Sequence, residues 1–338
     1  MDHLVVLLDS YYPEHSLERG IIEEAGGSFV YCNIGLRDEE HVLAQPLLSQ
    51  AEVVLTDLAP VTARVLRQAA SCRLVARYGV GFDNVDVAAA TAEGIWVANV
   101  PDYATDSVAD HAIMLLLTVA RQLRFYVRRL EHDGWRQPDD PYLNEPDMFP
   151  AMSGRVLGIV GFGRIGRAVG RRAHAMGMHV LAYDPFVSPG EIGKDGAESA
   201  DFETVLSQSD FVSLHCPLTE QTYHMIARDA LAKMRPGVII VNTARGDVVD
   251  LACLADALRT GHVRGAGLDV WDREPLPPGH PLRTHPAVVA TPHVAYLSDK
   301  SVRALREGVA RNAAAVLKGG PPLHLVNDPP SPRPRASG

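Results

Sequence analysis

The sequence predicts an α/β protein with two doubly wound parallel-sheet domains. The chain has 338 residues, long enough for two hydrophobic cores, and 46% of its residues are hydrophobic. Short β-branched runs alternate with helical stretches in both halves of the chain, and the second series opens on a glycine-rich turn at 161–166. Such alternation is typical of βα units that build a parallel sheet.

Four apolar runs in the first hundred residues predict the strands of the first domain. A helix is then expected from Thr105 to the basic pair Arg128-Arg129, where it would act as a connector. Four prolines and three aspartates at 137–152, without periodicity, predict a loop or flap. The four predicted strands lie at 4–8, 29–34, 53–56 and 74–76.

Six further apolar runs follow this loop and suit a complete dinucleotide-binding sheet. A final helix is expected over Asp299–Leu317, ended by Gly319-Gly320, and residues 328–338 have the composition of a disordered tail. The six predicted strands lie at 155–160, 179–183, 211–214, 238–241, 265–270 and 288–290.

Composition and charge exclude several classes of partner. The formal charge is −9, and no basic stripe with interleaved aromatic residues occurs, so we expect no nucleic acid partner. Cys32, Cys72, Cys216 and Cys253 show no C-x-x-C spacing, which predicts free thiols and no metal site. Without a signal-like N-terminus or an apolar stretch of membrane-spanning length, the chain is expected to be cytoplasmic, with no membrane partner.

A Rossmann-like nucleotide turn follows the first strand of the second series. The run RVLGIV leads directly into Gly161-Phe162-Gly163-Arg164-Ile165-Gly166, and a helical stretch follows. Gly161 permits a tight turn, Gly163 lets a pyrophosphate approach the backbone, and Gly166 permits close helix–strand packing. The helix N-terminus attracts phosphate oxygens. Methyltransferases have related glycine turns, so the turn alone leaves both classes open.

Asp184 stands at the end of the next predicted strand, eighteen residues after Gly166. A carboxylate at this place accepts both ribose hydroxyls and repels a 2′-phosphate, which favours NAD over NADP. A helix cap or a surface turn is the alternative interpretation of Asp184.

Three residues suited to hydride transfer follow consecutive strands. Reduction of a ketone needs a proton donor and a cation that polarises the carbonyl. Arg245 follows the strand at 238–241, Glu274 follows the strand that ends near Asp269, and His293 follows the last strand. Glu274 would fix the tautomer of His293 and favour its imidazolium. Taken singly, each residue has a structural alternative, such as a surface ion pair.

These residues belong to a set of motifs that resembles the D-isomer-specific 2-hydroxyacid dehydrogenase family. The resemblance extends from about residue 50 to 320 and is strongest to the branch of the C-terminal-binding proteins and phosphoglycerate dehydrogenases. The matching motifs are YGVGFDNVD at 78–86, NVP at 99–101, SVADH at 107–111, the glycine turn, HCPLT at 215–219, NTARG at 242–246, DREP at 272–275 and TPH at 291–293.

The resemblance implies a domain organisation with an active-site cleft between the two domains. A discontinuous, flavodoxin-like substrate domain is expected from residues 1–101 and 298–327, and an NAD-binding Rossmann domain from residues 102–297. It also implies a homodimer, joined through the cofactor domains and the helix after Thr105.

The resemblance further implies a role for each site residue. Arg245 would bind and polarise the substrate, Glu274 would orient His293, and His293 would be the acid/base. Backbone amides of Val80 and Gly81 would bind the substrate carboxylate. The implied cofactor contacts are Thr105, Gly161, Gly163, Arg164, Ile165, Gly166, Asp184, Cys216, Pro217, Thr222, Thr243, Ala244 and Asp269.

The function implied is NAD-dependent hydride transfer on a small anionic substrate, a (D-)2-hydroxy or 2-keto acid. Glu274 argues against formate oxidation, because formate dehydrogenases of this fold carry Gln there. An NAD-sensing corepressor-like binding protein, or an oxidiser of phosphite or a phosphonate, stays open as an alternative. Arg77 would meet a second anionic group or form a surface ion pair, and Tyr296 would line the substrate pocket or belong to a core.

Overall fold

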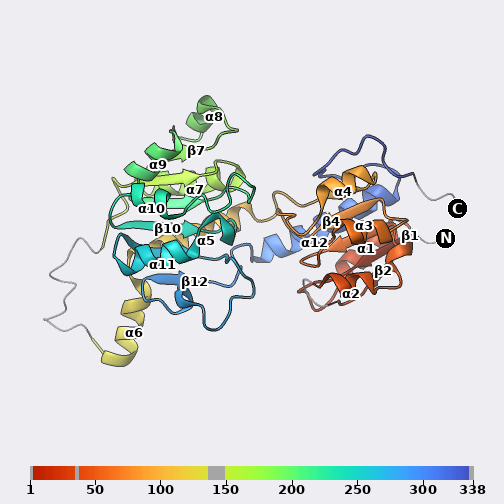
Figure 1. Cartoon of the computed structure of the whole chain (residues 1–338), viewed down its shortest axis with the longest axis horizontal. Helices are drawn as coiled ribbons and strands as arrows, with labels where there is room; N and C mark the ends of the chain where they lie inside the picture. Colours follow the sequence, from red (N-terminus) through yellow and green to blue (C-terminus); the bar gives the residue numbers. More distant parts are fainter. Residues whose placement is uncertain (1–2, 35–37, 136–148, 335–338) are drawn as a thin grey trace. The chain divides into compact units, whose positions relative to one another are not determined.

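A computed structural model describes residues 3–34, 38–135 and 149–334 of the chain (Figure 1). The chain divides into two compact units, Met1–Tyr103 with Ser298–Gly338, and Ala104–Leu297. The second division, after Leu297, falls at the expected position. The first division falls after Tyr103, where the sequence predicts a boundary after residue 101.

Unit 1 is built on one parallel sheet whose order, in the described residues, is β2-β1-β3-β4-β5. This is the flavodoxin-like doubly wound order. The strand β5, three residues long within the apolar run at 95–98, is not among the predicted strands. The strands are β1 (His3–Leu7), β2 (Gly27–Tyr31), β3 (Val53–Thr56), β4 (Leu74–Arg77) and β5 (Trp96–Ala98).

Each face of this sheet has its own hydrophobic core, because alternate strand residues point to opposite faces. Val5 and Leu7 pack with α1 and α12, whereas Val6 and Leu8 pack with α2, α3 and α4. The last helix, α12, therefore lies beside α1 in unit 1 (Figure 1). The helices are α1 (Ser16–Glu24), α2 (Glu39–Leu43), α3 (Ala63–Gln68), α4 (Val87–Ala92) and α12 (Asp299–Leu317).

Unit 2 contains a second parallel sheet, with the order β12-β11-β10-β9-β6-β7-β8 among the described residues. This is the Rossmann order with one strand added, and the order reverses between β6 and β9. The two-residue strand β8 is not predicted by the sequence, since it is too short to show a pattern. The strands are β6 (Val156–Val160), β7 (His179–Tyr183), β8 (Glu198–Ser199), β9 (Phe211–Leu214), β10 (Val238–Asn242), β11 (Val263–Leu268) and β12 (Val288–Ala290).

Helices cover both faces of this sheet as well. On one face α5 and α7 pack against the strands, and on the other α9, α10 and α11 do so. The single connecting helix predicted from Thr105 to Arg129 is wrong, because the chain breaks at Gln122, which has a left-handed φ of 48°. The helices are α5 (Thr105–Ala120), α6 (Leu123–Asp133), α7 (Arg164–Ala175), α8 (Pro189–Lys194), α9 (Phe202–Gln208), α10 (Arg228–Lys233) and α11 (Leu251–Arg259).

The disordered tail predicted at 328–338 begins too early in the chain. Arg333 donates hydrogen bonds to the carbonyls of Ala69 at 2.9 Å and Glu93 at 2.7 Å, and its backbone amide donates to Gly94. The segment up to Arg333 is thus held by long-range contacts that its proline-rich composition does not indicate. Residues 335–338, and most of the predicted loop at 137–152, lie outside the described residues.

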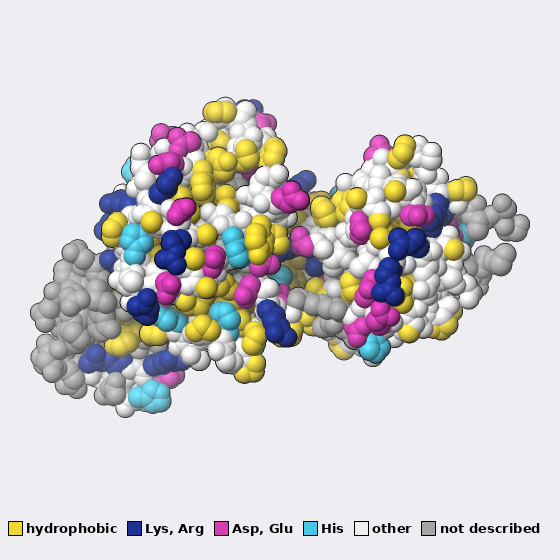
Figure 2. Space-filling model, in the orientation of Figure 1, with side chains coloured by type: hydrophobic (Ala, Val, Ile, Leu, Met, Phe, Trp, Pro, Cys, Tyr) yellow, Lys and Arg dark blue, Asp and Glu magenta, His cyan; other side chains and the backbone are white. Residues whose placement is uncertain are grey.

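Side chains of both charges are interspersed on the visible surface of each unit (Figure 2). Within the described ranges, no helix is both long enough and apolar enough to cross a bilayer.

Close packing of α12 onto the sheet of unit 1 requires a glycine. A Cβ atom on Gly308 would lie 2.7 Å from Cγ1 of Val100. We expect Gly308→Ala to lower the free energy of unfolding by roughly 1–2 kcal/mol, because overpacking exceeds the gain in helix propensity. The matched control is Gly20→Ala in α1, where a Cβ meets nothing within 4 Å. Thermal unfolding should show a lower Tm for the first variant only, and equal Tm values would contradict this packing.

Candidate active site

Three glycines shape the turn between β6 and α7 in unit 2, each for a different reason. Gly161 has a left-handed φ of 90°, and a Cβ there would lie 2.5 Å from the backbone nitrogen of Cys216. A Cβ on Gly166 would lie 2.2 Å from the carbonyl oxygen of Gly161. A Cβ on Gly163 would meet nothing within 4 Å. The space beside Gly163 is therefore open to a pyrophosphate at the helix N-terminus.

Asp184 lies beside this turn. Its Oδ2 accepts a hydrogen bond of 2.8 Å from the amide of Phe162, and its Oδ1 accepts one of 2.9 Å from the amide of Phe186. The carboxylate is thus held next to the glycine turn and is half-buried. This geometry suits an acceptor for ribose hydroxyls, and the negative charge opposes a 2′-phosphate.

The ends of β9 and β10 supply further groups on the same edge of the sheet. Burial raises the pKa of Cys216 to about 11, so this residue is a neutral thiol. The Oγ1 of Thr243 is buried and has no hydrogen-bond partner among the described residues. A buried polar atom without a partner is rare in proteins, and a bound dinucleotide would satisfy it. These residues therefore fit the predicted cofactor.

Other residues predicted to contact the cofactor show no geometry that points to a ligand. The hydroxyl of Thr222 donates 2.6 Å to the carbonyl of Pro217 and closes a turn. Ile165 and Arg164 lie in the first turn of α7, and Thr105 is the first residue of α5. Their contacts with the cofactor stay predictions.

The turn that carries Arg245 is organised by Asn242 at the end of β10. The Asn242 side chain accepts a hydrogen bond of 3.0 Å from the amide of Ala244 and donates one of 2.8 Å to the carbonyl of Arg245. A Cβ on Gly246 would lie 1.9 Å from the carbonyl carbon of Trp271. Glycine at 246 thus lets the Arg245 turn pack directly against the segment that leads to Glu274.

Glu274 and His293 form the pair that the sequence predicts. The Nδ1 of His293 lies 2.8 Å from Oε2 of Glu274, and Oε1 of Glu274 accepts 3.0 Å from the amide of Trp271. Both carboxylate oxygens are therefore engaged, and the imidazole ring is oriented through one of its nitrogens. Tyr296 lies beside the pair, with its ring 6.4 Å from the His293 ring in an edge-on arrangement.

Asp269 has a structural role that the sequence does not indicate. Its carboxylate is fully buried and accepts hydrogen bonds from the amides of Val294 at 2.9 Å and Ala295 at 2.8 Å, and from the hydroxyl of Thr291 at 2.5 Å. The amide of His293 also donates 2.7 Å to the Asp269 carbonyl. These bonds hold His293 in a left-handed conformation with a φ of 55°. Such a backbone costs of order 1 kcal/mol and persists only where its surroundings impose it.

His111 of α5 is a residue of this site that sequence reasoning missed. Its Nε2 lies 3.0 Å from the hydroxyl of Thr291 and 3.6 Å from the carboxylate of Asp269. The sequence signal for His111 is its position in the SVADH motif. The motif alone does not indicate which residues His111 contacts.

The predicted carboxylate loop belongs to unit 1 and follows β4. Gly79 has a left-handed φ of 142°, and a Cβ there would lie 1.5 Å from Nη1 of Arg77. Glycine thus makes room for the Arg77 guanidinium beside the loop. The carbonyl of Val80 accepts 2.6 Å from Nδ2 of Asn99, and the carbonyl of Gly79 accepts 3.0 Å from the amide of Val100. The loop is therefore held through its carbonyls.

No group of three or more His, Cys, Asp or Glu side chains in the described ranges is arranged to hold a metal ion.

The open space beside Gly163 generates a test of the cofactor site. Gly163→Ala should fold normally, because its φ of −74° suits alanine. It should bind NADH at least about tenfold more weakly, because the new Cβ occupies the path of the pyrophosphate. Gly190→Ala in α8, where a Cβ also has open space, is the matched control. Fluorescence titration measures the Kd of NADH for both variants. An unchanged Kd for Gly163→Ala would contradict the assignment of this space to the pyrophosphate.

Comparison with known proteins agrees with this geometry. Residues 113–295 match the model of the D-isomer specific 2-hydroxyacid dehydrogenase, NAD binding domain. A glyoxylate reductase of Korarchaeum cryptofilum is 43% identical over 274 residues, which cover 81% of this chain and 81% of that protein. A D-3-phosphoglycerate dehydrogenase of Mycobacterium leprae is 43% identical over 259 residues, covering 77% of this chain but only 48% of that longer protein.

A solved structure shows the same architecture over nearly the whole chain. The D-lactate dehydrogenase of Aquifex aeolicus, complexed with NAD and lactic acid, superposes with a TM-score of 0.82 at 28% identity. The match covers 93% of this chain and 96% of that one. Sheet order, nucleotide turn and comparisons agree: this chain belongs to the D-isomer specific 2-hydroxyacid dehydrogenase family and is an NAD-dependent enzyme that transfers hydride on 2-hydroxy or 2-keto acids.

Proposed function

We propose that the chain reduces a small 2-keto acid to the (D-)2-hydroxy acid with NADH, and that His293 is its acid/base. The hydrogen bond of 2.8 Å between His293 and Glu274, at the carboxyl edge of a Rossmann sheet, carries the proposal. Glyoxylate is the first substrate to test, because a relative 43% identical to this chain is a glyoxylate reductase.

Proton transfer is assigned to the free nitrogen of the imidazole. NADH supplies the hydride when it is bound. Because Nδ1 of His293 bonds to Glu274, Nε2 is the nitrogen that donates a proton to the keto oxygen and takes it back in the oxidative direction. The hydrogen bond to Glu274 also fixes the orientation of the imidazole ring.

Arg245 and Tyr296 complete the proposed machinery of unit 2. A guanidinium polarises a carbonyl and pairs with a carboxylate through two parallel hydrogen bonds. The Nη1 of Arg245 donates 2.8 Å to the carbonyl of Ala244, so one of its donors is engaged within its own turn. We assign Tyr296 to the side-chain pocket, because its ring lies edge-on to His293.

Two features of unit 1 are proposed to bind the anionic part of the substrate. Backbone amides of Val80 and Gly81 are assigned to the carboxylate, since consecutive amides in a glycine-flanked loop form an anion-binding nest. Arg77 is assigned to a second anionic group, because its guanidinium lies against Gly79 of the same loop.

Removal of either member of the pair should affect catalysis more than binding. We expect His293→Ala to lower kcat for glyoxylate by about 10²–10⁴-fold, the usual contribution of a general acid. Glu274→Gln should lower kcat by less, because the amide keeps a hydrogen bond but loses the charge. NADH oxidation is followed at 340 nm, with glyoxylate, pyruvate, hydroxypyruvate, phenylpyruvate and phosphonopyruvate as substrates.

Glu203→Gln on the exposed side of α9 is the matched control and should leave kcat unchanged. Full activity of His293→Ala would refute the acid/base assignment. NADH binding without turnover of any substrate by the wild type would favour the alternative of an NAD-sensing binding protein. Turnover of phosphite alone would favour the alternative oxidiser.

We also propose a homodimer joined through unit 2, in the cytoplasm. Leu123, Val127 and Leu130 follow one another at helical spacing on α6, and each is about half exposed. An exposed apolar row of this kind is typical of an interface. The four cysteines are free thiols, as is usual in the reducing cytoplasm.

A charge placed in this row should separate the subunits. Leu130→Glu is expected to halve the molar mass measured by light scattering after size exclusion, because an unpaired carboxylate would be buried. Glu131→Gln, a neighbouring exposed position on α6, is the control and should leave the mass unchanged. A monomeric wild type would refute the proposed dimer.

A further inference from the structure

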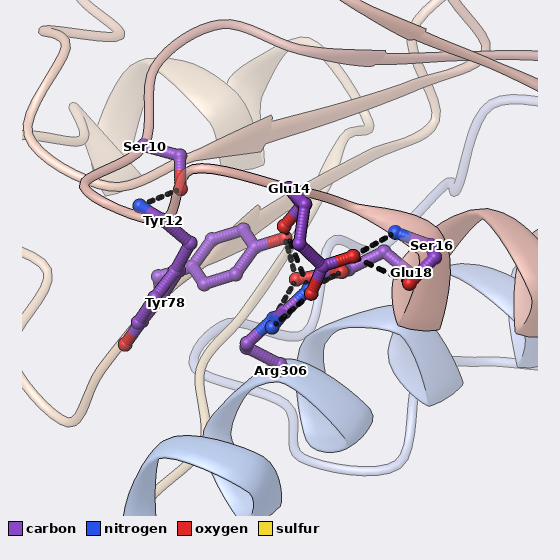
Figure 3. Close-up of polar contacts among 7 residues, drawn as sticks. All are labelled: Ser10, Tyr12, Glu14, Ser16, Glu18, Tyr78 and Arg306. Atoms are coloured by element: carbon purple, nitrogen blue, oxygen red, sulfur yellow. Dashed lines mark hydrogen bonds and ion pairs between the residues drawn. The ribbon is translucent and has the colours of Figure 1, made fainter.

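A fully buried carboxylate in unit 1 belongs to a residue that has no assigned role so far. Glu18 of α1 is 0% exposed. Its Oε1 accepts a hydrogen bond of 2.7 Å from Nε of Arg306, and its Oε2 accepts one of 2.7 Å from Nη2. The two side chains therefore form a bidentate ion pair between α1 and α12 (Figure 3). Buried ion pairs of this kind often contribute little net stability, because both charges lose their hydration. Net stabilisation of the fold is therefore not a sufficient reason for this ion pair.

Tyr78 connects this ion pair to the carboxylate loop. Its hydroxyl donates 3.2 Å to Oε1 of Glu18, and its ring is 1% exposed (Figure 3). Burial, together with the charge of Glu18, raises the pKa of Tyr78 well above its usual range, so the hydroxyl keeps its proton as a donor. The amide of Tyr78 donates 2.8 Å to Thr56. Tyr78 is thus fixed at both its backbone and its hydroxyl, directly before Gly79.

Arg306 is in turn held in place by groups other than Glu18. Its Nη1 donates 2.9 Å to Oε1 of Glu14, and its Nη2 donates 2.8 Å to the Glu14 carbonyl. The Tyr12 ring lies against the guanidinium, 5.2 Å from its carbon (Figure 3). Hydrogen bonds from the hydroxyl and amide of Ser16 and from Arg306 lower the pKa of Glu14 to about 2. Glu14 therefore stays charged at neutral pH.

A second connection runs from α12 to the same loop. The side chain of Asn312, which is 0% exposed, donates 3.0 Å to the carbonyl of Asn99. Asn99 then donates 2.6 Å from its side chain to the carbonyl of Val80. Between these contacts, Gly308 lets α12 approach Val100, whose amide donates to Gly79. Thus α12 is connected to Tyr78 through Glu18, and to Gly79 and Val80 through Val100 and Asn99.

We infer that Glu18 and Arg306 are positioning residues, which act through the Tyr78 hydroxyl to set the orientation of the Val80 and Gly81 amides for the substrate carboxylate. This inference rests on the proposed function, in which those amides bind the carboxylate. The connection through Asn312 holds the carbonyl side of the loop, and the connection through Tyr78 holds its start. A displacement of about 1 Å at a binding group can cost about 100-fold in rate, so rigid support of the loop has a measurable value.

Steady-state kinetics with glyoxylate and NADH test the inference on the full-length enzyme. Glu18→Gln, Arg306→Lys and Tyr78→Phe should each raise KM for glyoxylate by about tenfold, with kcat at saturation and the Kd of NADH within about twofold of wild type. Tyr78→Phe removes a single oxygen atom and is therefore expected to fold. It tests the inference even where Glu18→Gln fails to fold.

Two matched controls separate positioning from stability. Val65→Ala creates a cavity in the core on the opposite face of the same sheet and should lower Tm without changing KM. Arg303→Gln removes an exposed pair with Glu307 on α12 and should change neither quantity.

The outcomes of these measurements distinguish the inference from the proposed function. Raised KM in the three variants, with normal KM in Val65→Ala, supports the inference. A lower Tm with unchanged KM in Tyr78→Phe and Arg306→Lys overturns it and leaves the proposed function intact. A wild type that turns over none of the keto acids overturns the proposed function, and the inference with it.

Discussion

The buried carboxylate of Asp269 is the constraint on which the geometry of the candidate site in unit 2 depends. A charged group with no exposure to solvent is costly unless its oxygens are fully hydrogen-bonded. Asp269 meets this requirement by accepting the amides of Val294 and Ala295 and the hydroxyl of Thr291. Those bonds curl the chain after β12 and impose the left-handed backbone of His293. In that conformation the imidazole lies 2.8 Å from Glu274.

Unit 1 uses the same physical device at its own loops. The carboxylate of Asp9, at the end of β1, is fully buried and accepts the amides of Asp57, Leu58 and Ala59 at 2.7–2.9 Å. Glu18 is fully buried as well and accepts from a tyrosine hydroxyl and a guanidinium. In each case a buried anion gathers donors from segments that are distant in sequence. Loops at the carboxyl ends of parallel strands thereby acquire fixed shapes.

Glycines set how closely these loops approach one another. At Gly246 the backbone of the Arg245 turn packs on Trp271, and at Gly161 the nucleotide turn packs on Cys216, with no room for a Cβ in either case. Gly163 is different, because its missing Cβ leaves space for a ligand and not for another part of the chain. One residue type thus permits close packing at two positions and leaves open space, at the proposed cofactor site, at a third.

Local patterns in the sequence were sufficient to predict most strands of both sheets, the nucleotide turn and the pair of Glu274 with His293. Strands of four to six residues show as apolar runs, and strand order brings residues that follow parallel strands to one edge. The break at Gln122 and the two-residue strand β8 were not predictable in this way, because no apolar run marks them. The strand β5 does lie in an apolar run, at 95–98, and was overlooked. The packing of Arg333 depends on carbonyls of residues more than two hundred positions away.

The sequence by itself therefore determined the fold class, the glycine turn and the candidate residues for hydride transfer, since these follow from short-range periodicity and residue chemistry. Only the tertiary structure decided how those residues are held. The hydrogen bonds of Asp269 span up to 26 residues, and the ion pair of Glu18 with Arg306 spans 288. Contacts over such separations form when the chain folds around a shared core, and no local pattern encodes which partners will meet.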